Sequence, residues 1–168
     1  MTTPTGSPFT HSALFYRGRD EYLAGTVSFV RDGLAAGEPV AVAVPGENLA
    51  PIKSALGADA GAVKFLDMTE AGRNPGRILP GVLLAFANRH DGPVRIIGEP
   101  VWPDRSADEY PACAQHEALI NHAFANRAAW ILCPYDLAGL SPAALSDAEF
   151  THPLLTDSRG SLPRPASW

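Results

Sequence analysis

Val94-Arg-Ile-Ile-Gly-Glu-Pro-Val-Trp-Pro103 is the segment around which the fold of this chain can be predicted. It begins as a short β-branched run that ends at Gly98, which predicts a strand. An acid, two prolines and a tryptophan follow at once, a composition typical of a loop. The helix predicted next, from 110 to 124, adds tyrosine, cysteine, histidine, glutamate and asparagine. The chemistry of the chain is therefore expected to lie in and around this segment.

Strands and helices are predicted to alternate on both sides of it. The predicted strands are 11–16, 39–44, 63–67, 94–98 and 129–135, and the predicted helices are 21–36, 47–56, 75–89, 110–124 and 141–149. Asp20 is expected to cap the first helix, and Pro80 with Gly81 to bend the third or delay its start. This alternation predicts an α/β fold, a three-layer sandwich whose mainly parallel sheet has five or more strands and carries helices on both faces.

The size and composition of the chain favour one domain. Its 168 residues include 46% hydrophobic and 18% charged ones, which is ordinary for a globular protein. We predict a disordered lead-in over residues 1–10, a folded domain over 11–155, and a linker or tail over 156–168, where proline, glycine and serine replace any hydrophobic periodicity.

Charge and hydrophobicity also restrict the partners and the compartment. The net charge of −5 and the scattered Lys and Arg residues argue against direct nucleic-acid binding. Apolar runs are too short for a membrane helix, and no signal segment opens the chain, so a cytoplasmic location is expected. Cys113 and Cys133 lack C-x-x-C spacing and are expected to be ordinary buried thiols.

Polar and aromatic residues collect where the predicted strands end. Parallel strands direct their carboxyl ends to one edge of the sheet, where ligands bind in α/β proteins. The residues at these ends are Tyr16, Glu47, Asp67, Glu99, Trp102, Tyr135 and Asp136. Loops are polar in any case, so each residue alone is explained equally well without a ligand. The loop with Trp102 is the exception, because an exposed tryptophan usually has something to pack on.

The helix over 110–124 admits two interpretations. His116 lies on or beside its apolar stripe with Glu117 at the border, which favours a core histidine over a metal ligand. The alternative is a metal site in which His116, Glu117, Glu99 and Cys133 converge, but the sequence has no H-E-x-x-H frame. We therefore expect no metal or other cofactor. His11 opens the first strand and is expected to form a hydrogen bond away from the pocket.

The first strand–loop–helix unit has no phosphate-binding loop. It reads Arg17-Gly-Arg-Asp-Glu-Tyr-Leu-Ala-Gly-Thr26, without the lysine and glycines of a Walker A loop. Asp20 and Glu21 would repel phosphate at the helix N-terminus, so no ATP hydrolysis is expected. No G-x-S-x-G elbow is present either. A protein that is not an enzyme is predicted, and a metal-assisted hydrolase using Glu99, Glu117 and His116 is the alternative.

Several motifs together resemble the MEDS family, the DcmR-type sensory domains of methanogens, methylotrophs and actinobacterial regulators. The resemblance spans residues 11–153 and rests on His11-x-Ala-Leu-Phe-Tyr16, Gly37-Glu-Pro-Val-x-Val-Ala-Val-Pro45, Phe65-x-Asp-Met-Thr-Glu-x-Gly-Arg-Asn-Pro75, Arg95-Ile-x-Gly-Glu-Pro-x-Trp-Pro103, Glu109-Tyr-Pro, His116-Glu-Ala-Leu-x-Asn121 and Leu132-Cys-Pro-Tyr-Asp136. It implies a fold like the RecA and KaiC ATPase core, with a degenerate nucleotide loop.

The resemblance also implies a function. Such domains are expected to sense small organic compounds and to signal to an output partner or fused domain in transcription regulation, such as an anti-sigma or histidine-kinase-like module. The ligand-binding residues expected from the strand ends and the resemblance are Tyr16, Glu99, Trp102, Tyr110, His116, Glu117, Asn121, Tyr135 and Asp136. A pure protein-interaction module is a further alternative, and homo-oligomers are consistent with either reading.

Overall fold

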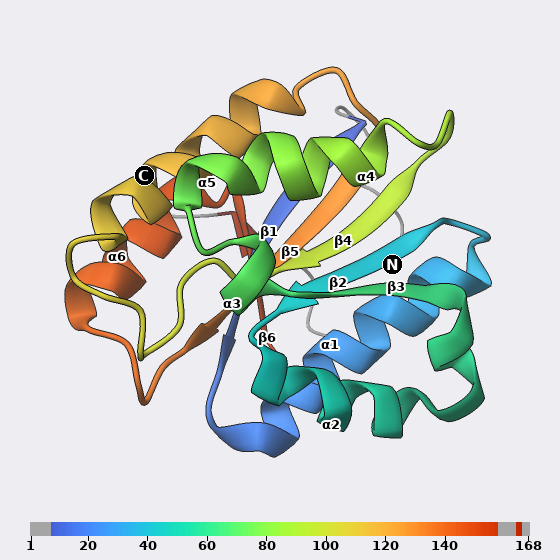
Figure 1. Cartoon of the computed structure of the whole chain (residues 1–168), viewed down its shortest axis with the longest axis horizontal. Coiled ribbons are helices and arrows are strands. Elements are labelled where there is room, and N and C mark those ends of the chain that lie inside the picture. Colours follow the sequence, from blue (N-terminus) through green and yellow to red (C-terminus); the bar gives the residue numbers. More distant parts are fainter. Residues whose placement is uncertain (1–7, 158–163, 166–168) are drawn as a thin grey trace.

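The protein is a three-layer α/β sandwich in the computed structural model, which describes residues 8–157 and 164–165 (Figure 1). The strands are β1 (Phe9–Tyr16), β2 (Val40–Val44), β3 (Val63–Asp67), β4 (Val94–Gly98), β5 (Ala129–Asp136), β6 (Leu154–Asp157) and β7 (Arg164–Pro165). The helices are α1 (Gly18–Ala35), α2 (Gly46–Leu56), α3 (Met68–Ala71), α4 (Ala85–Ala87), α5 (Tyr110–Ala123) and α6 (Pro142–Thr151).

The sheet has the order β3-β2-β4-β5-β1-β6-β7. The pairs from β3 to β6 are all parallel, and only the two-residue β7 is antiparallel. The predicted α/β sandwich with a mainly parallel sheet is therefore confirmed. The central position of β4 explains its composition, because all five of its residues are buried between the two helical layers.

Arg95 is a charged residue within that buried strand. Its side chain lies on the α1 face, where its guanidinium packs over the rings of Phe29 and Trp130. Its Nε donates to the carboxylate of Glu38. Stacking and a paired carboxylate together compensate for the burial of this charge.

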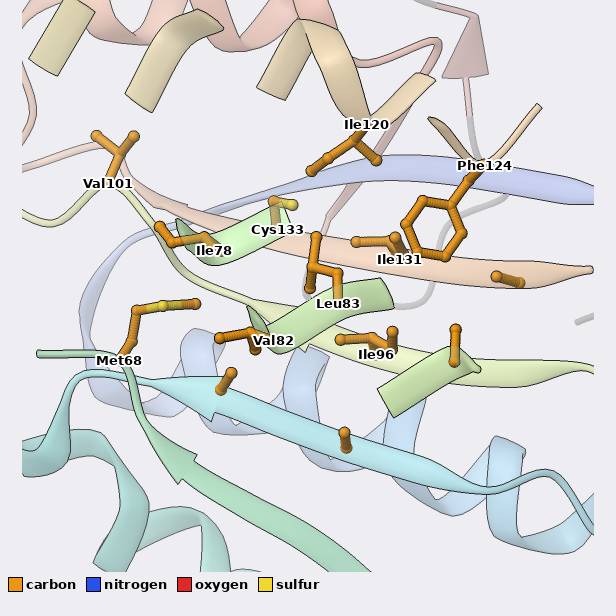
Figure 2. Close-up of a cluster of buried hydrophobic side chains, with 14 of the residues drawn as sticks. Met68, Ile78, Val82, Leu83, Ile96, Val101, Ile120, Phe124, Ile131 and Cys133 are labelled. Carbon is orange, nitrogen blue, oxygen red and sulfur yellow. The ribbon is translucent and has the colours of Figure 1, made fainter. Parts of the chain in front are cut away.

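Each face of the sheet has its own hydrophobic core. Helices α1 and α2 cover one face, over Leu14, Val42 and Leu132. Helices α4, α5 and α6 lie on the other face (Figure 1). Figure 2 shows that second core, in which Leu83, Ile120 and Phe124 from the helical layer pack over Ile96, Ile131 and Cys133 of the sheet. Successive strand residues point to opposite faces, so each strand contributes to both cores.

The first helix begins earlier than predicted. Gly18, with a φ of 74°, turns the chain directly from β1 into α1. Asp20 therefore lies in the first turn and is not the cap, and the Glu21 carboxylate accepts a hydrogen bond of 2.7 Å from the backbone N–H of Arg17. The acidic first turn is thus real, and it leaves the start of α1 unsuited to a phosphate.

The predicted helix over 75–89 is divided into three short elements. These are a 3₁₀ turn, η2 (Pro75–Arg77), a π-helical segment, η3 (Leu79–Leu84), and α4. Pro80 and Gly81 lie at the start of the π-helical segment. Proline has no N–H and its ring clashes with the carbonyl four residues earlier, so the expected delay of the regular helix is observed.

The predicted termini agree only in part with the structure. Strand β1 starts at Phe9, two residues before the predicted strand. Within the stretch predicted as a tail, β6 extends to Asp157 and β7 covers Arg164–Pro165. The remainder of the lead-in and tail, residues 1–7, 158–163 and 166–168, lies outside the described residues. Within the described part of the chain, no helix has the length and apolar character needed to cross a membrane.

Candidate functional site

A pocket lies at the carboxyl ends of β1, β2, β4 and β5. Its volume is about 210 Å³. The residues that line it come from the ends of these strands, the first turns of α1 and α2, and the loop after β4. They are Tyr16, Gly18, Arg19, Tyr22, Glu47, Asn48, Pro51, Glu99, Trp102, Pro103, Asp104 and Asp136. We call it the Glu99 pocket. It occupies the position at which parallel α/β sheets bind ligands.

Glu99 is the buried polar group of this pocket. It directly follows β4 and is only 1% exposed. The hydroxyl of Tyr22 donates to Glu99 Oε2 over 2.8 Å, and Asn48 Nδ2 lies 3.4 Å from the same oxygen. Tyr22 belongs to α1 and Asn48 to α2, so both helices of this face hold the carboxyl group in place.

The electrostatics of the pocket favour a neutral Glu99. Burial, with smaller contributions from the nearby Asp136 and Glu47 carboxylates, raises the pKa of Glu99 to about 8 against the lowering effect of the two hydrogen bonds. At neutral pH this carboxyl therefore keeps its proton and can act as both a donor and an acceptor. Burial and the Glu99 carboxyl likewise raise the pKa of Tyr22 well above its usual value.

The loop after β4 forms one wall of the pocket. Trp102 is half-buried there, and the guanidinium of Arg105 lies 4.3 Å from the centre of its ring. Arg105 Nη2 donates to the carbonyl of Gly72 over 2.8 Å, and its Nε lies 2.9 Å from Cys113 Sγ. Arg105 thereby joins the pocket wall to the end of α3 and to α5.

Four of the nine predicted ligand-binding residues line the Glu99 pocket: Tyr16, Glu99, Trp102 and Asp136. Sequence reasoning missed Tyr22, which also fits the apolar stripe of its helix, and Asn48. Their signal is positional. Both lie in the first two turns of the helices that follow β1 and β2, next to the carboxyl edge of the sheet.

The other five predicted residues lie on the α5 side of the sheet. Tyr110 donates a hydrogen bond of 2.6 Å to Asp147 of α6, and Tyr135 packs against His152. His116 is buried, its Nδ1 has no hydrogen-bond partner among the described residues, and burial lowers its pKa. The last two, Glu117 and Asn121, lie beside His11.

A second polar cluster therefore exists, on the face opposite to the Glu99 pocket. It consists of His11 from β1, Glu117 from α5, Cys133 from β5 and His152 after α6, and we call it the His11 cluster. One nitrogen, oxygen or sulfur atom from each residue lies within 4.8 Å of all the others. His11 does form the expected hydrogen bond, 2.9 Å to Asn121 Oδ1, but it is not isolated from the predicted polar residues.

The four residues considered for a metal site do not converge as a group. Glu117 and Cys133 meet in the His11 cluster, whereas Glu99 lines the pocket across the sheet and His116 belongs to neither set. Sequence reasoning did not single out His152. The first strand, α5, the fifth strand and the end of α6 meet only in three dimensions, so spacing along the chain gave no metal-type motif.

The comparisons with known proteins agree with this architecture. The family model described as MEDS, the methanogen/methylotroph, DcmR sensory domain, matches residues 10–153. The crystal structure of the KaiC-like protein PH0186 from Pyrococcus horikoshii superimposes with a TM-score of 0.60 at 12% identity, over 89% of this chain and 71% of that one. No curated protein matches the chain. The structural likeness establishes a KaiC-like fold, and the family match, which covers most of the chain, shows that this protein belongs to the MEDS family of sensory domains.

Proposed function

We propose that this domain senses a small polar organic molecule, such as an amine, in the Glu99 pocket and relays its binding to an output partner. Membership of a sensory family supports the role of a sensor. The observation that carries the choice of site is the buried Glu99 carboxyl, fixed by Tyr22 and Asn48 at the carboxyl edge of the sheet.

The size of the pocket restricts the ligand. A volume of about 210 Å³ corresponds to roughly seven molecules of liquid water at about 30 Å³ each. Pockets for drug-sized ligands are larger, from about 300 Å³ upward. This volume suits a ligand of a few heavy atoms.

The charges around the pocket restrict it further. Glu47, Asp104 and Asp136 line it together with Glu99, whereas Arg19 is the one basic residue in the described lining. Carboxylate ligands would be repelled by this set. An ammonium group is attracted by it and also stacks favourably on the faces of Tyr16 and Trp102.

The loop after β4 offers a route for the signal. A ligand that contacts Trp102 would shift the indole ring, and the Arg105 guanidinium that packs on this ring would shift with it. Arg105 also donates to the carbonyl of Gly72 and lies close to Cys113. Ligand binding would thereby shift the equilibrium between two arrangements of the loop, α3 and the start of α5. A partner protein that binds this surface in only one of the two arrangements would respond to the presence of the ligand.

The test is a thermal-shift and calorimetric comparison of methylamine, propylamine and butylamine with the alcohols and carboxylates of matched chain length. Amines are expected to raise Tm and carboxylates to have no effect. At a hundredfold excess over Kd the stabilisation should reach about 2.7 kcal/mol. Amine binding should also release a proton, because an ammonium beside Glu99 favours the ionised carboxylate.

Variants separate binding in the pocket from a general solvent effect. Trp102→Ala and Glu99→Gln should each raise the Kd for the amine at least about tenfold. The first removes one wall of the pocket, and the second removes the carboxyl that ionises when the ammonium binds. Leu119→Ala, which changes an exposed residue of α5 outside the pocket, is the matched control. Equal responses of wild type and Trp102→Ala would refute the assignment of the pocket.

A further inference from the structure

We propose that the His11 cluster is a binding site for a divalent transition-metal cation, with Zn²⁺ as the best fit. The ligands are His11 Nε2, His152 Nε2, one carboxylate oxygen of Glu117 and the thiolate of Cys133. The site is separate from the Glu99 pocket, because it lies in the core between the sheet and α5.

Three distances within the cluster are close to those of tetrahedral coordination, and all four ligand atoms lie within 4.8 Å of one another. Glu117 Oε2 lies 3.2 Å from His11 Nε2 and 2.9 Å from His152 Nε2, and Cys133 Sγ lies 3.5 Å from His11 Nε2. Zinc bonds of about 2.0–2.1 Å to nitrogen or oxygen and about 2.3 Å to sulfur place tetrahedral ligand atoms about 3.3 to 3.6 Å apart. Small adjustments of side chains therefore suffice to hold the ion.

The tautomer of His11 is determined by Asn121. Asn121 Nδ2 donates a hydrogen bond of 2.7 Å to the carbonyl of Thr151, so its other amide atom, Oδ1, faces His11 Nδ1 at 2.9 Å. An amide oxygen only accepts, so Nδ1 of His11 carries the proton. In the neutral ring, Nε2 then directs a lone pair into the cluster.

The same argument applies to His152. Its Nδ1 lies 2.8 Å from the carbonyl oxygen of Ala148, which also only accepts. Its Nε2 is therefore the unprotonated nitrogen of the neutral ring. Metal-binding histidines characteristically have this arrangement, in which the distal N–H donates to an amide or carbonyl oxygen and orients the ring.

As a result, several hydrogen-bond acceptors face one another in the His11 cluster, and too few N–H or O–H groups are present to donate to them. The two Nε2 lone pairs and the carboxylate of Glu117 converge, and both Glu117 oxygens and His152 Nε2 have no hydrogen-bond partner of good geometry among the described residues. All four residues are at least 98% buried. Such groups are costly unless a cation is shared among them.

Charge balance selects a divalent ion. A histidine binds a metal ion through the lone pair of a neutral ring, so His11 and His152 add no charge to the site. The Cys133 thiol releases its proton to solvent when the metal binds. Glu117 and the Cys133 thiolate then contribute two negative charges, which one divalent cation neutralises. A mixed set of two imidazoles, one thiolate and one carboxylate suits Zn²⁺ and the related ions Co²⁺ and Ni²⁺ rather than Mg²⁺ or Ca²⁺.

The experiment uses the full chain, purified without a metal-affinity tag and treated with chelator. Titration with Zn²⁺ and with Co²⁺ is expected to saturate at one ion per chain and to raise Tm. The Co²⁺ form should show the visible bands of a tetrahedral site and a thiolate-to-metal band in the near ultraviolet. A wild-type protein that takes up neither ion stoichiometrically would overturn the proposal.

The chain contains a matched control for the cysteine. Cys133→Ser should abolish the thiolate band and weaken Co²⁺ binding by a factor of at least about 100. Cys113→Ser removes the other buried thiol, which lies outside the cluster, and should leave both unchanged. Equal loss in the two variants, or a retained band in Cys133→Ser, would contradict the assignment.

A variant behind the ligands completes the test if Cys133→Ser does not fold. Asn121→Asp replaces the acceptor for His11 Nδ1 with a stronger one, whereas Asn121→Leu removes it. The first should retain Co²⁺ binding and the second should weaken it about tenfold to a hundredfold. His116→Gln changes a buried histidine outside the cluster and should bind like wild type. Equal binding by both Asn121 variants would count against the ligand role of His11.

Discussion

At the scale of single residues, two buried glutamates have opposite environments. Burial dominates at Glu99 and raises its pKa to about 8, since Tyr22 and Asn48 offer only neutral hydrogen bonds. Glu117 is equally buried, but its Oε2 faces two imidazole rings, 3.2 Å from His11 Nε2 and 2.9 Å from His152 Nε2. Glu99 is thus held by two neutral donors, whereas Glu117 lies against two histidine nitrogens.

The state of Glu99 predicts a pH dependence of stability. Its pKa is about 8 in the folded protein and near the ordinary 4.5 in the unfolded chain. Between these values the folded state retains a proton that the unfolded state releases, so stability falls as pH rises through this window. The full loss is on the order of 5 kcal/mol, at about 1.4 kcal/mol for each pKa unit.

Glu99→Gln should remove that loss, because the amide does not titrate. Urea unfolding at about pH 5 and about pH 8 is expected to show a strong decrease for wild type and a much flatter response for the variant. Glu70→Gln, at an exposed position, is the control and should follow wild type. Parallel pH profiles for wild type and Glu99→Gln would exclude a raised pKa.

At the scale of elements, α1 packs closely on the sheet at its glycines. A Cβ on Gly33 would come within 2.6 Å of Arg95 Cδ and 3.0 Å of Val40 Cγ2. Arg95 cannot move freely, because its guanidinium packs against the rings of Phe29 and Trp130 and is paired with Glu38. The close approach of helix to sheet therefore requires glycine at this position.

Gly33→Ala should destabilise the protein by about 1–3 kcal/mol although alanine is the better helix former, because the clash outweighs the propensity. Gly81→Ala is the matched control, since its Cβ would meet no atom within 4 Å and its φ is not positive. That variant should be neutral or stabilised by up to about 1 kcal/mol. Denaturant unfolding measures both. A Gly33→Ala protein as stable as wild type would show that α1 can move away from the sheet.

The helices and strands that could be predicted from the sequence are those whose pattern of apolar residues lies within the element itself. The apolar runs of β2 and β4 and the periodicity of α1 and α5 are carried by neighbouring residues, and these elements lie within a few residues of their predicted positions. Strand β6 was missed because Leu154-Leu-Thr-Asp157 is too short for a period. The His11 cluster was missed because strand order, which sequence does not give, brings β1 between β5 and β6.

At the scale of the whole molecule, the sheet separates the two proposed sites. The Glu99 pocket opens at the carboxyl edge on the α1 and α2 side, and the His11 cluster lies beneath α5 and α6. His152 completes the cluster from the junction of α6 and β6. Strand β6 pairs with β1 over four residues and otherwise only with the short β7. Because β6 has few other contacts in the sheet, we expect its stability to depend more on the His11 cluster than that of any other strand.

Hydrogen exchange should resolve the two sites. Adding Zn²⁺ to metal-free protein is expected to slow exchange in β6 and the last turn of α6, since the ion ties His152 to β1, α5 and β5. Propylamine should instead slow exchange over residues 99–105, where Trp102 and its loop form the pocket wall. Cys133→Ser should lose the first effect and keep the second, and Trp102→Ala should do the reverse. If both ligands protected the same amides, or if Zn²⁺ protected all strands equally, the sheet would not separate two independent sites.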